Sequence, residues 1–178
     1  MVVIAGGGRA TRADVPAEKQ ALIMLRILAY DHALATRTGA TVRLAIVRGE
    51  SRAALACAGQ MRSAFDDLAR LVVVTGKRLE VETLSIAEVS AQAFVQRRFS
   101  VLYVCIGSDA ALPAIVRAAQ AAQSLTFTDQ VAYLALGLSI ALAADGPRVG
   151  ISVNLVAARA EGARLAGQLL RLSKVVSR

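Results

Sequence analysis

The 178-residue chain has no tryptophan, one histidine and two cysteines, and aromatic residues make up only 4% of it. A single histidine cannot supply a multi-histidine metal site. The two cysteines, Cys57 and Cys105, lack the spacing of a CxxC or zinc motif, so we expect two buried thiols, with a disulfide left open. The scarcity of aromatic side chains removes the stacking surfaces that bind single-stranded nucleic acid.

No stretch of the sequence reaches the 18 or more apolar residues that a membrane-spanning helix needs. The longest apolar run, 131–144, contains Gly137 and Ser139, and we interpret it as a buried strand or as two short elements. The chain is nevertheless 56% hydrophobic, which at this length provides a substantial core. We therefore predict one globular domain that does not itself span a membrane.

The formal net charge is +8. The Lys and Arg residues are scattered, and no nucleic-acid-binding motif accompanies them. An acidic protein surface or anionic lipid headgroups would suit the same charge. We therefore expect no nucleic-acid partner.

The first 13 residues allow two interpretations. Residues 2–5 and the glycines after them resemble a strand entering a dinucleotide-binding turn, with Gly6 and Gly8 in place but Thr11 where the third glycine belongs. The alternative is the remnant of a secretory signal, in which residues 2–5 end an apolar region and residues 11–13 form a small-x-small cleavage site. We favour the signal remnant and therefore expect a secreted protein.

Strand and helix patterns alternate along the rest of the chain. Strands are predicted at 41–47, 79–84, 101–106, 124–128, 138–143 and 149–153, and helices at 17–35, from Ser51 to Leu68, and at 85–98, 110–122 and 155–176. This order predicts an α/β fold, a single three-layer domain over residues 14–178. Its mixed sheet is mostly parallel, with helices on both faces and a C-terminal β-hairpin followed by a long helix.

The closing segment, 148–178, carries the clearest pattern. After Asn154, apolar or small residues recur at intervals of three and four, at Leu155, Ala158, Gly162, Leu165, Leu169, Leu172 and Val176. This spacing predicts one amphipathic helix that Asn154 caps. Arg164, Arg171 and Lys174 fall off the apolar stripe, so we expect them to be exposed and to be the first places to test for a partner.

Candidate sites elsewhere are few. His32 adjoins Asp31, but neighbours on a helix point apart, and Asp66 and Asp67 are expected on a solvated face. No nucleophile, base and oxyanion donor come together, so we predict no enzyme and no cofactor or metal.

The strand ends are more informative. Gly107 and Ser108 follow a buried strand, and Gly49 and Asp129 follow two others. Ligands gather at the carboxyl ends of parallel strands, which makes this edge a candidate pocket. Helix capping by Ser108 or Asp109 is the simpler interpretation.

The closing segment also resembles the C-terminal signature of YfiR-type periplasmic proteins. In those proteins an extended segment ending in Asn-Leu, here Asn154-Leu155, leads to a small-residue helix with a Gly and a Leu-Leu-x-Leu ending, here Leu169-Leu170-Arg171-Leu172. Segments 42–49, 101–108 and 125–129 follow in the family's order. The family's aromatic and Trp-Pro element is replaced by 30–38, and its Gly-Gly segment is altered at 130–137.

The resemblance implies a non-catalytic periplasmic regulator. Such proteins bind and repress an inner-membrane signalling protein, a diguanylate cyclase, and so control cyclic-di-GMP; a sensor kinase is another candidate partner. We expect a homodimer formed through apolar helices, with Asn154, Arg164, Arg171, Lys174, Gly107, Ser108 and Asp129 as partner or ligand contacts. Two alternatives stay open, a small-molecule sensor with a pocket at the strand ends and a nucleotide-dependent enzyme using Gly6 and Gly8.

Overall fold

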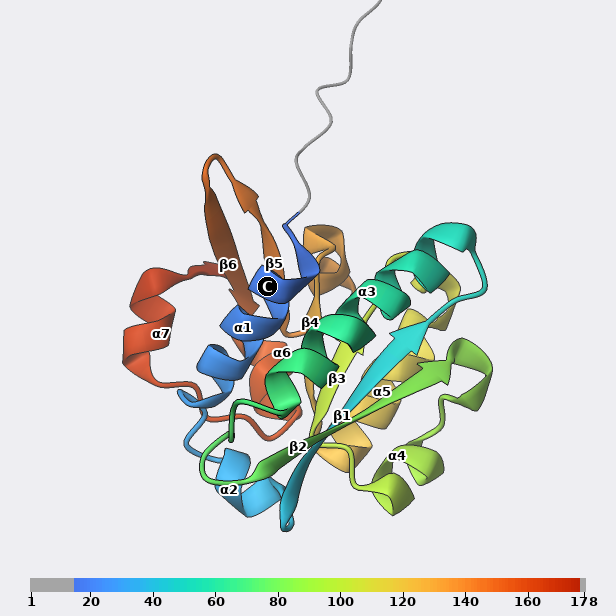
Figure 1. Cartoon of the computed structure of the whole chain (residues 1–178), viewed down its shortest axis with the longest axis horizontal. Helices are drawn as coiled ribbons and strands as arrows, with labels where there is room; N and C mark the ends of the chain where they lie inside the picture. The colour runs from blue at the N-terminus through green and yellow to red at the C-terminus, as the bar shows by residue number, and fades with distance from the viewer. Residues whose placement is uncertain (1–14, 177–178) are drawn as a thin grey trace, which may run out of the picture.

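A mixed sheet of seven strands runs through residues 15–176, the part of the chain that the computed structural model describes (Figure 1). The strands are β1 (Thr41–Arg48), β2 (Arg78–Ser85), β3 (Val101–Val104), β4 (Leu125–Thr128), β5 (Ile140–Asp145), β6 (Arg148–Asn154) and β7 (Lys174–Val176). They are ordered β2-β1-β3-β4-β5-β6-β7, and every neighbouring pair is parallel except the β5–β6 hairpin. The predicted hairpin and mostly parallel sheet are confirmed.

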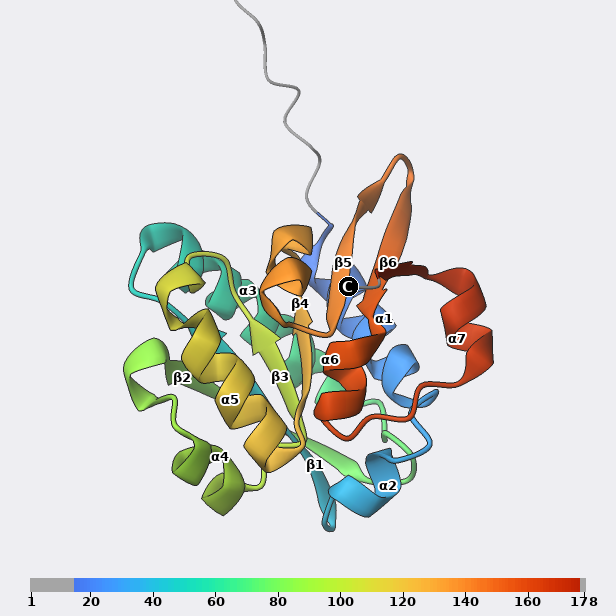
Figure 2. The ribbon, with the colours of Figure 1, turned by 180° about the vertical axis from the view of Figure 1, so that it is seen from behind.

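Helices cover both faces of the sheet, as predicted. They are α1 (Ala17–Leu28), α2 (Leu34–Arg37), α3 (Arg52–Ala69), α4 (Ala91–Arg97), α5 (Leu112–Ala122), α6 (Leu155–Ala160) and α7 (Gly167–Leu172), with short 3-10 helices η1 (Ile86–Glu88), η2 (Asp109–Ala111) and η3 (Val131–Leu136). Helices α1 and α3 lie on the face seen in Figure 1, and α4 and α5 lie on the face seen in Figure 2. Within residues 15–176, every helix is too short or too polar to span a bilayer.

The sheet therefore separates two apolar cores. On one face, Met24 of α1 and Phe65 of α3 pack with Ile46, Tyr103 and Phe127 of the central strands. On the other, Phe94 of α4 and Ile115 of α5 pack with Val47, Leu102 and Val104. Strands β3 and β4 are buried along their whole length, which is typical of parallel strands covered on both sides. Strand β3 is accordingly apolar throughout, whereas β4 carries two buried threonines, Thr126 and Thr128.

The prediction of one long closing helix is wrong. Helix α6 ends at Ala160, Gly162 has a left-handed φ of 78°, and α7 begins only at Gly167. Strand β7 then pairs with β6 where the pattern placed the end of the helix. Leu172, which the pattern assigned to the buried stripe, is 74% exposed. The break occurs because the side chain of Glu161 turns into the core, and glycine permits the turn that follows.

Two further predicted elements are divided in the structure. The helix predicted over 17–35 ends at Leu28, and a turn at Asp31 separates it from α2, because the Asp31 carboxylate accepts a hydrogen bond from the Ala33 N–H. The apolar run 131–144 forms two short elements, η3 and β5, which confirms the second of the two structures predicted for it. Both interpretations of residues 1–13 lie outside the described residues.

Candidate functional site

A cavity of about 240 Å³ lies between α1 and α3, beside the residues that follow β3 and β4. Its wall is mixed, with three glutamines, one carboxylate and mostly small or apolar side chains. The lining residues are Val15, Ala17, Gln20, Ala53, Ala56, Cys57, Gln60, Met61, Tyr103, Ile106, Asp129 and Gln130. Asp129 was among the predicted residues, whereas Gly107 and Ser108 do not line the cavity.

A buried chain of hydrogen bonds forms one wall of this cavity. The Tyr103 hydroxyl donates to Gln20 Oε1 at 2.9 Å, and Gln20 Nε2 donates to the Val15 carbonyl at 2.8 Å. Burial, reinforced by the negative charge of Asp129, raises the pKa of Tyr103 well above its ordinary value, so its hydroxyl stays a donor near neutral pH. Gln20 and Tyr103 were not predicted as site residues from the sequence. The available signal was a polar residue on the face of α1 that also carries Met24 and Leu28.

The backbone of the loop after β3 forms hydrogen bonds with a tyrosine side chain. The backbone N–H groups of Gly107 and Ser108 donate to the Tyr133 hydroxyl at 3.1 and 3.3 Å, and that hydroxyl donates to Asp109 Oδ2 at 2.8 Å. Neither Ser108 nor Asp109 caps a helix with its side chain, so the capping interpretation is wrong. A Cβ at Gly49 would lie 2.7 Å from the Gly107 carbonyl oxygen, so the turn after β1 has no room for a side chain.

The two cysteines meet at this end of the sheet. Their Sγ atoms are 2.6 Å apart, and both cysteines are free. Cys105 is fully buried, as predicted. Cys57 is only half-buried and lines the cavity, so the prediction of a buried thiol is wrong for this residue. The hydrogen bond with Cys105 lowers the pKa of the Cys57 thiol, whereas the same contact and burial raise that of Cys105. Cys57 is therefore the thiol that ionises first.

We predict that diamide links Cys57 and Cys105 within one chain. The oxidised protein should have lost the mass of two hydrogens and should resist alkylation until dithiothreitol is added. It should also be more stable by about 4 kcal/mol, because the bond closes a long loop. Cys57→Ser is the control and should show neither change. Two thiols that both remain alkylatable after diamide would contradict the prediction.

Asn154 caps α6, as predicted. Its Oδ1 accepts a hydrogen bond from the Ala157 N–H at 3.0 Å, and its Nδ2 donates to the Leu134 carbonyl at 2.9 Å. The side chain therefore fixes α6 to η3, and both ends of its amide are occupied. This arrangement gives Asn154 a positioning role for the closing segment.

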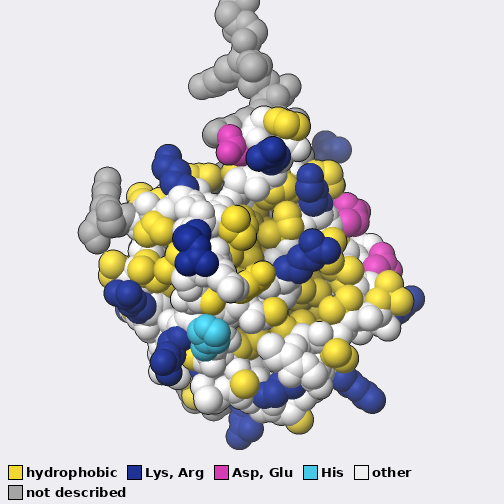
Figure 3. Space-filling view, turned by 90° about the vertical axis from the view of Figure 1, so that its left-hand side faces the viewer, with side chains coloured by type: hydrophobic (Ala, Val, Ile, Leu, Met, Phe, Trp, Pro, Cys, Tyr) yellow, Lys and Arg dark blue, Asp and Glu magenta, His cyan; other side chains and the backbone are white. Residues whose placement is uncertain are grey.

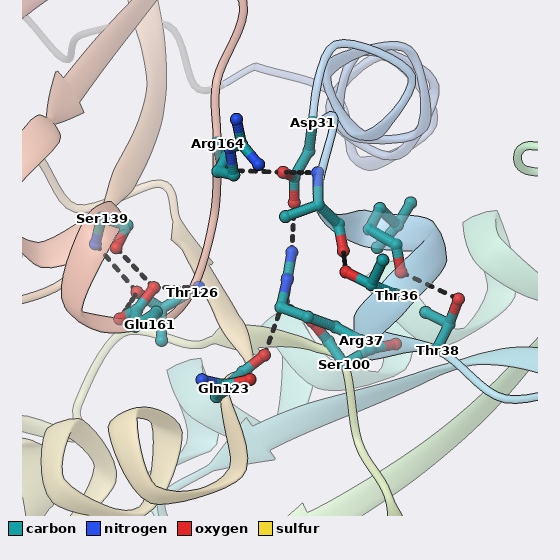
Figure 4. Close-up of polar contacts among 12 residues, drawn as sticks. Asp31, Thr36, Arg37, Thr38, Ser100, Gln123, Thr126, Ser139, Glu161 and Arg164 are labelled. Atoms are coloured by element: carbon teal, nitrogen blue, oxygen red, sulfur yellow. Dashed lines mark hydrogen bonds and ion pairs between the residues drawn. The ribbon is translucent and has the colours of Figure 1, made fainter.

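Two buried carboxylates hold the closing segment in place (Figure 4). Asp31 forms an ion pair with Arg37, and its Oδ1 accepts from the Arg164 N–H at 2.8 Å. Glu161 Oε2 accepts from the Thr126 N–H at 2.9 Å and from the Ser139 hydroxyl at 2.5 Å, and its Oε1 accepts from the Thr126 hydroxyl at 2.8 Å. Burial raises the pKa of Glu161 to about 7, although these hydrogen bonds oppose the shift.

The closing segment presents a basic surface. Its exposed cations are Arg148, Arg159, Arg164, Arg171 and Lys174, which we call the basic C-terminal surface. None of the five pairs with a carboxylate of residues 15–176. Figure 3 shows one side of the molecule, where Lys and Arg side chains stand among apolar ones and acidic side chains lie near the border. The predicted partner residues Arg164, Arg171 and Lys174 are thus exposed, although they do not share one helix.

Three solved structures share the fold of this chain. A conserved domain protein from Vibrio cholerae matches with a TM-score of 0.59 and 16% identity, over 92% of this chain and 60% of that one. An ABC domain in complex with L-Trp from Streptococcus pneumoniae matches at 0.61 and 11%, over 90% and 60%. An open, ligand-free substrate-binding protein with adhesive properties from Clostridium difficile matches at 0.65 and 12%, over 93% and 61%. The chain thus spans about 60% of the length of these proteins.

No curated protein matches the chain in a sequence search. A family model described as YfiR/HmsC-like, however, matches residues 18–174, which is most of the sequence and includes strands β1 to β6 in full. This agrees with the resemblance carried by the closing segment. The chain belongs to the YfiR/HmsC-like family.

Proposed function

We propose that this chain is a periplasmic, non-catalytic regulator that binds and represses a membrane-bound diguanylate cyclase. The family match over residues 18–174 carries the proposal. The exposed cations of the basic C-terminal surface, with exposed Val156, Leu172 and Val175 beside them in sequence, support it, because protein interfaces combine apolar contact with charge complementarity.

Repression by such a protein is a matter of linkage. The regulator shifts the cyclase toward its inactive state only by binding that state more tightly than the active one. A signal that lowers the regulator's affinity for the inactive state releases the enzyme. This mechanism needs no catalytic group in the regulator and places the specificity in its surface.

Deleting the gene in its source organism should therefore raise cellular cyclic-di-GMP, by about fivefold if the coupling lies in the usual range for allosteric effects. Re-expression with a secretion signal should restore the low level, as measured by mass spectrometry of nucleotide extracts. The matched control is the same chain without a secretion signal, which should not restore it. Equal cyclic-di-GMP in the deletion and parent strains would argue against repression.

One observation favours a second candidate, a small-molecule sensor. The 240 Å³ cavity places Gln20, Gln60, Asp129 and Gln130 around an apolar interior, at the strand ends where α/β proteins bind ligands. L-Trp, with which one of the structural neighbours is in complex, is the first probe. A melting temperature that rises with L-Trp concentration in the wild type, but not in a cavity-filling Ala56→Phe variant, would support a sensor.

A further inference from the structure

We propose that a hollow beneath the α6–α7 connection binds a carboxylate from an acidic segment of a partner protein. This inference rests on the proposed function in one respect, since it names the chemistry by which that partner is recognised. The hollow lies between the connection and the turn that joins α1 to α2, and its volume is about 310 Å³. It is lined by Arg159, Arg164 and His32 together with Leu155, Ala163, Leu165 and Leu170.

The backbone that carries Arg164 is held on both sides. The His32 N–H donates to the Arg164 carbonyl at 3.1 Å, and the Arg164 N–H donates to buried Asp31 at 2.8 Å. The side chain of Arg164 itself makes no hydrogen bond or ion pair with the described residues, and that of Arg159 makes none either. Two guanidinium groups therefore stand exposed on a fixed frame, and planar guanidinium groups bind carboxylates in a bidentate manner.

The charge around the hollow is uncompensated. Residues 148–176 contain the five cations of the basic C-terminal surface and a single acidic residue, Glu161, which is fully buried. Among residues 15–176, no acidic side chain lines the hollow. Figure 3 shows His32, the chain's single histidine, on the face where Lys and Arg side chains border apolar surface. An acidic ligand is therefore attracted to this face from a distance and held by the guanidinium groups at contact.

The leucines in the lining indicate a protein segment as the source of the carboxylate. Leu155, Leu165 and Leu170 give the hollow an apolar wall, which suits an acidic side chain flanked by aliphatic residues. A second copy of this chain using the same face would set cations against cations, which is unfavourable. A concave site with an apolar wall also fits a side chain better than it fits a flat layer of lipid headgroups.

The test compares two charge-matched double variants. Arg159→Glu/Arg164→Glu changes the hollow, and Arg52→Glu/Arg117→Glu changes two exposed cations that line no part of it; each removes four units of charge from the +8 of the chain. The probe is a fluorescein-labelled 12-residue peptide of alternating Glu and Leu pairs, with its Gln-for-Glu counterpart as a second probe. We expect the hollow variant to bind the Glu peptide at least about tenfold more weakly than the wild type, and the control variant to lose about twofold or less. The Gln peptide should bind all three proteins weakly.

Several results would overturn the inference. Equal losses of affinity in the two variants would show that only the net charge of the protein matters. If the Gln peptide bound the wild type as tightly as the Glu peptide, the site would not recognise a carboxylate. Binding to phosphatidylglycerol vesicles that the hollow variant loses, without peptide binding, would assign the surface to lipid. Self-association that the hollow variant abolishes in sedimentation experiments would assign it to a second copy. If circular dichroism shows the hollow variant to be unfolded, Arg159→Gln/Arg164→Gln takes its place, and an unchanged affinity there counts equally against the inference.

The failure of this inference and that of the proposed function are distinguishable. If the secreted hollow variant still lowers cyclic-di-GMP in the deletion strain, the chain is a regulator whose interface lies elsewhere on its surface. If peptide binding depends on Arg159 and Arg164 but the gene does not affect cyclic-di-GMP, the carboxylate site is supported and the cyclase is excluded as the partner.

Discussion

Replacing Asp31 by alanine is expected to lower the free energy of unfolding by about 3–5 kcal/mol, the largest effect of any single substitution that we predict. The Asp31 side chain is fully buried, and that of its partner Arg37 is 4% exposed. Alanine leaves the buried guanidinium without its counter-charge. It also removes the acceptor of the Arg164 and Ala33 N–H groups, so three elements lose a shared anchor.

A surface ion pair supplies the control for Asp31. Asp66 pairs with Arg62 one turn earlier on α3 at 2.7 Å, and both side chains are more than 40% exposed. Such a pair contributes about 0.5 kcal/mol, so Asp66→Ala should barely move the midpoint of urea unfolding followed by circular dichroism. The double variant Asp31→Leu/Arg37→Met should recover much of the stability lost in Asp31→Ala, because it removes both buried charges. Equal stability losses for Asp31→Ala and Asp66→Ala would contradict the assignment of Asp31 as a buried anchor.

The sequence predicted the parallel sheet well because its signals are local. The continuous apolar run at 101–104 is sufficient to indicate a strand covered on both faces, and the alternating run at 125–128 indicates a further strand. The closing helix failed for a reason that periodicity cannot detect. Residue 161 falls off the apolar stripe, so periodicity alone places Glu161 in solvent, whereas its carboxylate accepts hydrogen bonds from Thr126 and Ser139 in the core. Only the following Gly162 hinted at a break.

The candidate sites show the same division between local and distant signals. Asp129 was recognisable because it follows a buried strand, but Gln20 reaches the cavity through a contact with Tyr103 that spans 83 residues. His32 and Arg164 meet across an even longer separation, and nothing in the sequence around either residue indicates the other. Spacing along one helix predicted the exposed cations correctly. It could not predict that Arg164 stands opposite the turn after α1.

Replacing Glu161 by glutamine is expected to remove most of the dependence of stability on pH between about 4.5 and 7. The folded state raises the pKa of this carboxyl from 4.5 to about 7, chiefly because the group is buried. A raised carboxyl pKa means that the folded protein holds the proton more tightly than the unfolded chain. The stabilisation is therefore complete below the unfolded pKa and is lost as the pH rises through the folded value. A shift of this size amounts to about 3 kcal/mol.

The glutamine variant keeps the shape of the site while fixing its charge at zero. Its oxygen retains the position that accepts from the Thr126 N–H and the Ser139 hydroxyl, and its amide group faces the Thr126 hydroxyl, which can reorient to accept. We expect Glu161→Gln to match the wild type near pH 4.5 and to exceed its stability above pH 7. Urea unfolding at half-unit steps of pH from 4.5 to 8 measures both.

Glu161→Ala separates the charge from the hydrogen bonds. It too is uncharged, so its stability should lack the same pH dependence, but it leaves the Thr126 and Ser139 donors buried without an acceptor. Its unfolding free energy should therefore lie about 2–4 kcal/mol below that of the glutamine variant at every pH. Parallel pH profiles for the wild type and Glu161→Gln would assign the titration to another group. Glu161 lies directly before the connection that carries Arg164. The dependence of stability on pH therefore also reports how strongly the core holds the backbone beside the hollow.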